Sequence, residues 1–204
     1  MVQLAFFSAE IDDPVVADLS GLLAAHGQSS VSEAGSRVSV VVTARWRAEA
    51  IADAIRACGI DAELSTSDEG SPLARSEATP RLTALHRSWS RGAVKAMPVT
   101  WVPSPRALRM WVLAAGRRDG DRYLLGLDPH APETHAALAT ALMRVGIAPT
   151  LVGTRSRSPA LRIAGRRLTR LVEYVGAPPA SAPPASAEAD WPPSGDMRAG
   201  IGDA

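Results

Sequence analysis

The sequence predicts an α+β fold made of two tandem copies of one unit, each with the element order α-β-β-α-β-β-α. The segments Leu19–Gly27 and Leu108–Gly116 are similar runs of small and aliphatic residues and lie 89 positions apart. The segments Arg56–Leu64 and Met143–Leu151 align at an offset of 87, with a Gly-Ile pair and the closing leucine in register. Further agreements follow in the same order, and they pair residues 71–72 with 158–159 and residues 81–85 with 167–171. Together they indicate an internal duplication.

The first copy alternates helical and strand patterns. Leu19, Leu22 and Leu23 share one helix face, and Pro14 suits the first helical turn. The β-branched run 38–42 favours a strand, and Gly59 suits a left-handed helix end. The expected helices are 13–26, 47–58 and 80–90, and the expected strands are 29–34, 37–43, 61–66 and 72–78.

The second copy repeats this order with one defect. Its expected helices are 105–116, 134–145 and 166–175, and its expected strands are 123–128, 148–153 and 160–164. Only six residues separate Gly116 from Tyr123, so the first strand of this copy is predicted to be shortened or absent.

Composition bounds the domain organisation. With 204 residues and 46% hydrophobic content the chain can bury a substantial core. We expect residues 1–102 and 103–177 to be the two halves of one domain, and residues 178–204, rich in proline and alanine, to form a disordered tail. The single Cys58 cannot form an internal disulfide and is read as a buried helix residue. No stretch has the length of a membrane span, so we expect a cytoplasmic protein without membrane contact.

The duplication and the nonapeptide Leu19–Gly27 resemble the LAGLIDADG homing-endonuclease fold over about residues 13–177. This resemblance implies two signature helices that pack together on a pseudo-twofold axis, with small residues at their contact. The residues that would make this contact are Gly21, Ala24, Ala25, Ala114, Ala115 and Gly116. The bulk of Met110 and Trp111 departs from the pattern and predicts a wider or shifted contact.

The resemblance also implies where the catalytic acids of an active enzyme would stand. The eighth position of each signature is acidic in those enzymes and binds a divalent metal, because Mg²⁺ prefers hard oxygen ligands. Those positions hold His26 and Ala115 here, which predicts that the chain is not an endonuclease. Loss of both acids is similar to the LAGLIDADG-like domain of the WhiA transcription regulators, although we do not expect the Pro/Ala-rich tail to form their helix-turn-helix domain.

Charge is distributed unevenly along the chain and points to a partner. Residues 1–102 carry nine basic and twelve acidic side chains, whereas residues 103–177 carry twelve basic and five acidic ones. All twelve are arginine, whose planar fork suits phosphate oxygens. We therefore expect duplex DNA as a partner. The expected DNA contacts are Arg155, Arg157, Arg162, Arg166, Arg167 and Arg170.

A second class of function stays open. Duplicated α/β units also serve as regulatory modules that bind a protein or a small molecule without touching DNA, and the acidic first half would weaken a symmetric DNA surface. The sequence shows no phosphate-binding glycine loop and no Cys/His cluster, so no cofactor or metal is expected. The four histidines are scattered.

Overall fold

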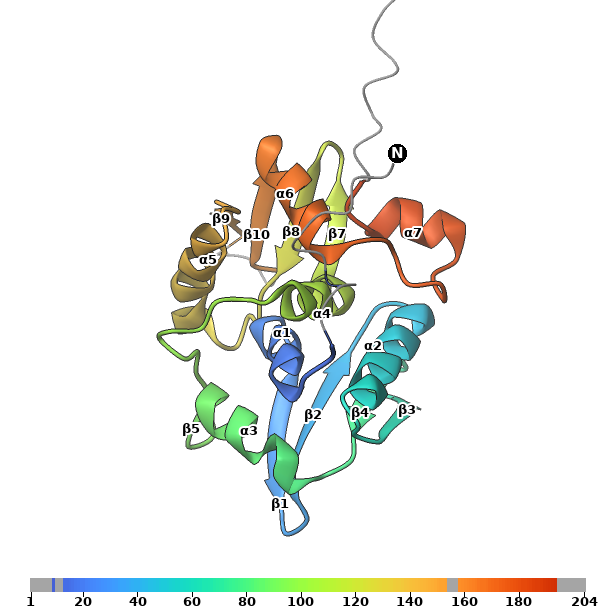
Figure 1. The fold of residues 1–204 in the computed structure, drawn as a ribbon, viewed down its shortest axis with the longest axis vertical. Coiled ribbons are helices and arrows are strands. Elements are labelled where there is room, and N and C mark those ends of the chain that lie inside the picture. Colours follow the sequence, from blue (N-terminus) through green and yellow to red (C-terminus); the bar gives the residue numbers. More distant parts are fainter. Residues whose placement is uncertain (1–8, 10–12, 154–157, 194–204) are drawn as a thin grey trace, which may run out of the picture.

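The computed structural model describes Ala9, residues 13–153 and residues 158–193. The predicted mixed α+β architecture is confirmed, and Figure 1 shows one sheet on each side of two central helices. The elements of the first half are η1 (Val16–Leu19), α1 (Ser20–Ala24), β1 (Gln28–Ser32), β2 (Gly35–Val41), α2 (Arg45–Ala57), β3 (Ala62–Thr66), β4 (Pro72–Ser76), η2 (Pro80–Leu82) and α3 (Thr83–Trp89). A short hairpin, β5 (Ser90–Arg91) and β6 (Val94–Lys95), follows.

The second half has the same order of helices and strands. Its elements are α4 (Pro105–Ala115), β7 (Gly116–Asp119), β8 (Arg122–Gly126), η3 (Pro132–Thr134), α5 (His135–Arg144), β9 (Thr150–Val152), β10 (Ala160–Ala164) and α6 (Arg166–Val175). The strand expected to be shortened or absent is present as the four-residue β7. Helix α7 (Pro184–Asp190) follows outside the repeat.

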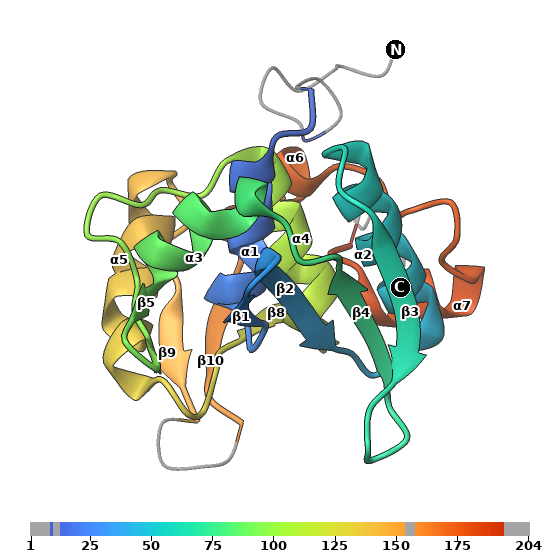
Figure 2. The ribbon, with the colours of Figure 1, turned by 90° about the horizontal axis from the view of Figure 1, so that it is seen from below.

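Each half contains one antiparallel sheet, and the two sheets have corresponding strand orders. The first is β1-β2-β4-β3 and the second is β7-β8-β10-β9. Figure 2 shows the sheets inclined to one another, with α2 outside one and α5 outside the other. The order of elements thus repeats as the sequence predicts, whereas the pseudo-twofold relation of the halves stays a prediction.

The two central helices meet at their closest point through a glycine. A Cβ atom added to Gly21 would lie 1.8 Å from the carbonyl oxygen of Ala107 and 2.9 Å from the Cβ of Met110. Ser104 caps α4 by accepting from the N–H of Ala107, and its hydroxyl donates to Asp18 (2.7 Å), which joins the beginnings of both helices.

The first signature helix is shorter than the predicted 13–26. It starts as the 3₁₀ turn η1 and α1 ends at Ala24, because Ala25 is extended and the chain turns into β1. Gly27 permits that turn, since a Cβ atom there would lie 2.5 Å from the carbonyl oxygen of Leu22.

The described part of the tail is ordered, which corrects the expected disorder of 178–204 over residues 178–193. Trp191 is 3% exposed, and its indole N–H donates to the carbonyl of Gly176 (2.9 Å). The hydroxyl of Tyr123 donates to Asp190, and Arg118 donates to Glu188, so β7 and β8 hold this segment. Composition did not predict this order, because the segment has no apolar periodicity and is held by Trp191 and a few hydrogen bonds. Residues 194–204 lie outside the described part.

Candidate nucleic-acid interface

Each sheet has one face against the helices and one face turned away from them, which we call the open face. Strand β2 shows this alternation, because Val38 and Val40 are buried while Arg37, Ser39 and Val41 are partly exposed. In β8 the side chains of Tyr123 and Leu125 are fully buried, and Tyr123 reaches the tail on the helix side. Residues that alternate with these belong to the open faces.

One row of paired residues crosses each open face at a corresponding place. In the first sheet, the register pairs Ser39 of β2 with Gln28 of β1 and Arg75 of β4, and Arg75 with Glu63 of β3. In the second sheet, Arg162 of β10 pairs with Leu124 of β8 and Thr150 of β9, and Leu124 pairs with Arg117 of β7. The pairs Arg75/Arg162 and Glu63/Thr150 preserve the offset of 87 found in the sequence. The two rows are the equivalent rows of two equivalent sheets.

The charges of these rows differ. The first row contains one arginine and one glutamate, and Arg75 lies 3.5 Å from Glu63, so the row is neutral and its cation is paired. The second row contains Arg117 and Arg162 and no acid. Arg122 continues the same face one row further, opposite Asp119 and 3.5 Å from Asp121, and Arg37 holds the corresponding place on the first sheet. The second open face therefore keeps a larger net positive charge than the first, whose cations are Arg37 and Arg75, and should attract phosphate more strongly.

The predicted arginines do not form one surface. Arg162 lies on the open face, but α6, which carries Arg166, Arg167 and Arg170, packs its buried residues on the helix side of the fold. Arg170 donates to Glu173 (3.1 Å) and stacks on Tyr174. Arg155 and Arg157 lie outside the described residues.

Sequence reasoning missed Arg117, the most informative cation of the open face. It lies one residue beyond the signature segment, within the strand that was expected to be shortened or absent. The usable signal was the alternation of Arg117 and Asp119 with Arg118, which places the first two on one face and the third on the other.

The two positions of the family's metal-binding acids lie where α1 and α4 end. The ring Nε2–H of His26 donates to the carbonyl of Val41 (2.6 Å). Ala115 offers no ligand atom and lies close to Gly126 of β8. Among the described residues, no three His, Cys, Asp or Glu side chains gather as a metal site would require. The residues at these positions therefore do not fit the paired-carboxylate metal site.

A buried lysine takes the C-terminal end of α1. The Lys95 ammonium donates to the carbonyl of Ala25 (2.9 Å) and forms an ion pair with Asp128 at 2.7 Å. Their side chains are 9% and 4% exposed. Gln28 also donates to Asp128 (3.1 Å), so residues of both halves meet here.

The protonation of this pair follows from burial and from the contact itself. Burial lowers the pKa of Lys95, and the hydrogen bond and charge of Asp128 oppose that shift. Burial raises the pKa of Asp128, but the hydrogen bond and charge of Lys95, the N–H of His130 and the Gln28 amide outweigh it and hold that pKa below its ordinary value. The Asp128 carboxyl is therefore ionised at neutral pH.

A buried arginine takes the corresponding end of α4. Arg47 of α2 donates to the carbonyls of Val112 (3.0 Å), Leu113 (2.9 Å) and Gly116 (2.7 Å). It also lies 3.4 Å from Asp190 of α7. A cation suits this position because the carbonyls at a helix C-terminus carry partial negative charge.

The six residues predicted to pack the signature helices together divide into two groups. Gly21, Ala24 and Ala25 are buried in the first helix and its end, and Gly21 makes the close approach to α4. On α4, this close contact is made by Ala107 and not by the predicted Ala114, Ala115 and Gly116. Ala115 and Gly116 face the second sheet, since added Cβ atoms at Gly126 and Gly116 would meet Ala115 and Tyr123 respectively. Ala114 is buried in α4. Met110 lies at this close contact, whereas Trp111 points to the second sheet and donates to the carbonyl of Gly126.

Comparison with solved structures identifies the fold. The chain is similar to the homing endonuclease I-WcaI bound to its DNA recognition sequence, with 10% identity and a TM-score of 0.61 over 90% of this chain and 89% of that one. It is also similar to the N-terminal LAGLIDADG domain of WhiA, with 14% identity and a TM-score of 0.55 over 87% and 97% of the two chains. Full-length WhiA from Thermatoga maritima gives 14% identity and a TM-score of 0.58 over 80% of this chain, which spans about half (55%) of that one.

These similarities establish a LAGLIDADG-like fold, as the sequence predicted. No protein-family model matches the chain, and no curated protein matches it by sequence. In the described part of the chain, none of the helices has the length and apolar character that a membrane crossing needs.

Proposed function

We propose that this chain is a non-catalytic LAGLIDADG-like protein that binds duplex DNA through the open face of its second sheet and acts in transcription regulation in the cytoplasm. The observation that carries the proposal is the second open-face row, where Arg117 and Arg162 stand at places held by Gln28 and Arg75 in the first sheet. The similarity to I-WcaI, whose structure contains its DNA recognition sequence, supports the choice of partner.

The geometry of the row suits a phosphate backbone. Arg117 and Arg162 lie on strands β7 and β10, separated by β8, which places their backbones about 10 Å apart. Each guanidinium can donate two parallel hydrogen bonds to one phosphate. At this spacing the two arginines can reach separate phosphates. Contacts of this kind position a protein on DNA without reading its sequence.

The absence of cleavage is proposed from the ends of α1 and α4. An active LAGLIDADG enzyme would hold a divalent cation there on two carboxylates, whereas this chain has His26 and Ala115. The ammonium of Lys95 and the guanidinium of Arg47 already satisfy the helix-end carbonyls. These two cations occupy the helix ends where a metal ion would have to bind, so incubation of the protein with plasmid DNA and Mg²⁺ or Mn²⁺ is expected to leave the plasmid intact.

Fluorescence anisotropy with a labelled duplex tests the proposal. The wild-type protein should bind with an affinity that falls steeply as salt rises, because bound arginines release counterions. The triple variant R117Q/R122Q/R162Q should lose most of that affinity and most of the salt dependence. The double variant R37Q/R75Q, which changes the open face of the first sheet, should bind nearly as the wild type does. Equal losses in the two variants, or no binding at low salt, would contradict the proposal.

A further inference from the structure

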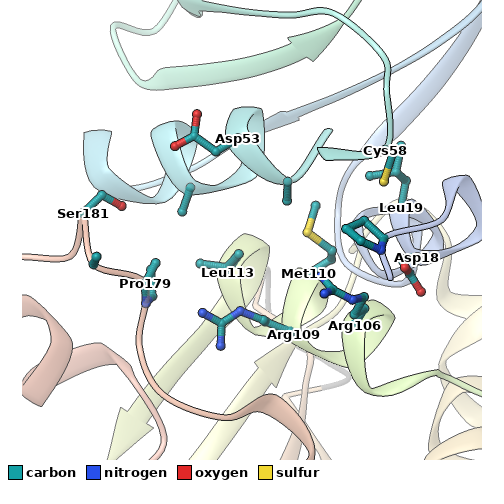
Figure 3. Close-up of a pocket in the computed structure, with 14 residues that line it drawn as sticks. Asp18, Leu19, Asp53, Cys58, Arg106, Arg109, Met110, Leu113, Pro179 and Ser181 are labelled. Carbon is teal, nitrogen blue, oxygen red and sulfur yellow. The ribbon is translucent and has the colours of Figure 1, made fainter. Parts of the chain in front are cut away.

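A second candidate site lies on the helix side of the fold. It is a cavity of about 220 Å³ between α2, η1, α4 and the chain segment 179–181 (Figure 3). Its walls come from both halves and from the ordered part of the tail. This cavity plays no part in the proposed DNA contact.

One part of the wall of this cavity is an apolar patch. Leu19, Met110 and Leu113 are at most 3% exposed, and Ala54 of α2 completes the wall opposite α4. A space of this size holds about seven waters at roughly 30 Å³ each, yet the apolar patch offers them few hydrogen bonds. An aliphatic chain of similar size would therefore gain free energy on entering.

The rim of the cavity is cationic on the α4 side. Arg106 and Arg109 line it, and Figure 3 shows both extending from α4 beside Met110 and Leu113. Arg109 donates to the carbonyls of Val175 and Ala177 (both 2.5 Å), and its guanidinium lies 5.0 Å from the ring centroid of Trp191. These contacts fix the guanidinium at the rim before any ligand arrives, which lowers the entropy cost of binding.

The two acidic residues of the cavity already accept hydrogen bonds. Asp18 accepts from the N–H of Val15 (3.0 Å) and from Ser104, and Asp53 accepts from Arg56 (2.9 Å). Asp18 lies on η1 and Asp53 lies on α2, whereas both arginines lie on α4. A carboxylate head group on the α4 side of the opening would therefore meet the two cations.

We propose that this cavity binds a small amphipathic carboxylate, with its aliphatic chain between α2 and α4 and its carboxylate at Arg106 and Arg109. Residues 179–181 form part of the wall, so a bound ligand stabilises the tail against opening. The site is independent of the DNA-binding proposal because it lies on the other side of the sheets.

Titration of the full chain with octanoate, octanol and octylamine, followed by calorimetry and thermal unfolding, tests this site. Octanoate should bind saturably and raise Tm, about tenfold more tightly than octanol because it adds charged hydrogen bonds. Octylamine should bind more weakly than either. Hydrogen exchange within residues 178–193 should slow when octanoate is bound. No octanoate binding, or equal binding of octanoate and octanol, would overturn the proposal.

Two variants locate the binding. Ala54→Phe fills the cavity and should abolish the octanoate response, whereas Ala137→Phe, at an exposed position of α5, should preserve it. Arg106→Gln should bring octanoate affinity down to that of octanol while leaving octanol unchanged. This second variant keeps the test decisive if Ala54→Phe does not fold. Octanoate binding that survives both Ala54→Phe and Arg106→Gln would place the ligand elsewhere and contradict the site.

Discussion

The two sheets have corresponding strand orders and equivalent open-face rows, but their surfaces suit different partners. The row Gln28-Ser39-Arg75-Glu63 is neutral and contains an ion pair, while the row Arg117-Leu124-Arg162-Thr150 carries two cations. Side chains on the helix-facing side of each sheet are constrained by packing in the core. Side chains on the open faces can be substituted without disturbing that core. The comparison teaches that two sheets with one strand order can present open faces of different charge.

The ends of the central helices make a second comparison between the halves, and they give the largest expected effect. Arg47→Met removes the buried cation from the α4 end and leaves the carbonyls of Val112, Leu113 and Gly116 without that donor. The free energy of unfolding should fall by about 3–5 kcal/mol, as for other broken buried ionic contacts. Urea unfolding measures it. Arg45→Met, an exposed neighbour paired with Glu49, should cost less than about 1 kcal/mol. Similar costs for both would contradict this role of Arg47.

Lys95 binds the C-terminal end of α1, and the effect of replacing Lys95 on stability should depend on its partner Asp128. Lys95→Met leaves the carboxylate of Asp128 buried without its cation, and we expect a loss of about 3 kcal/mol in unfolding free energy. The double variant K95M/D128L removes both charges and should recover most of that loss. A double variant as unstable as Lys95→Met would show that the ion pair is not the source of the cost.

The matched arginines of the two rows should differ in their effect on DNA binding. Arg162→Gln removes one phosphate contact, which should reduce the slope of log affinity against log salt by about 1. Arg75→Gln changes the equivalent position of the first sheet and should leave the slope unchanged, because Arg75 is paired with Glu63. Anisotropy titrations at four salt concentrations give both slopes. An equal change for the two variants would remove the distinction between the sheets.

The smallest expected effect is on acid stability. Because the folded-state pKa of Asp128 is depressed, its contribution to stability is fully present above the ordinary aspartate pKa of about 3.9 and is lost as pH falls through the lower folded-state value. Thermal unfolding of the wild type should therefore weaken over this window more than that of Asp128→Asn. Parallel pH profiles of the two proteins would contradict the assigned pKa direction.

The sequence predicted the fold because its repeats and its hydrophobic spacing are local signals. The offset of 87 found in the sequence relates Arg75 to Arg162 and Glu63 to Thr150 in the sheets. The candidate site was harder to predict, because a surface depends on which strand face a residue occupies. Arg162 was named, but Arg117 was missed, and the arginines of α6 were grouped with a face that they do not share.

The long-range polar contacts carried no sequence signal. Lys95 meets Asp128 across 33 residues, and Arg47 meets the end of α4 across more than 60. The tail was misjudged for the same reason, since its order depends on Trp191 and Asp190 reaching Gly176 and Arg47. Tertiary contacts of single residues leave no periodicity in the chain.

Photo-crosslinking from positions beside the two matched arginines tests most directly whether the second sheet holds the DNA. A photoreactive amino acid at Thr150 lies beside Arg162, and the same group at Ser39 lies beside Arg75 in the first sheet and leaves the Arg75–Glu63 ion pair in place. With a labelled duplex at low salt, the Thr150 position should give the stronger crosslink by a wide margin, and that crosslink should disappear at high salt. Equal crosslinking from both positions, or crosslinking from the Ser39 position alone, would contradict the assignment of the DNA contact to the second sheet.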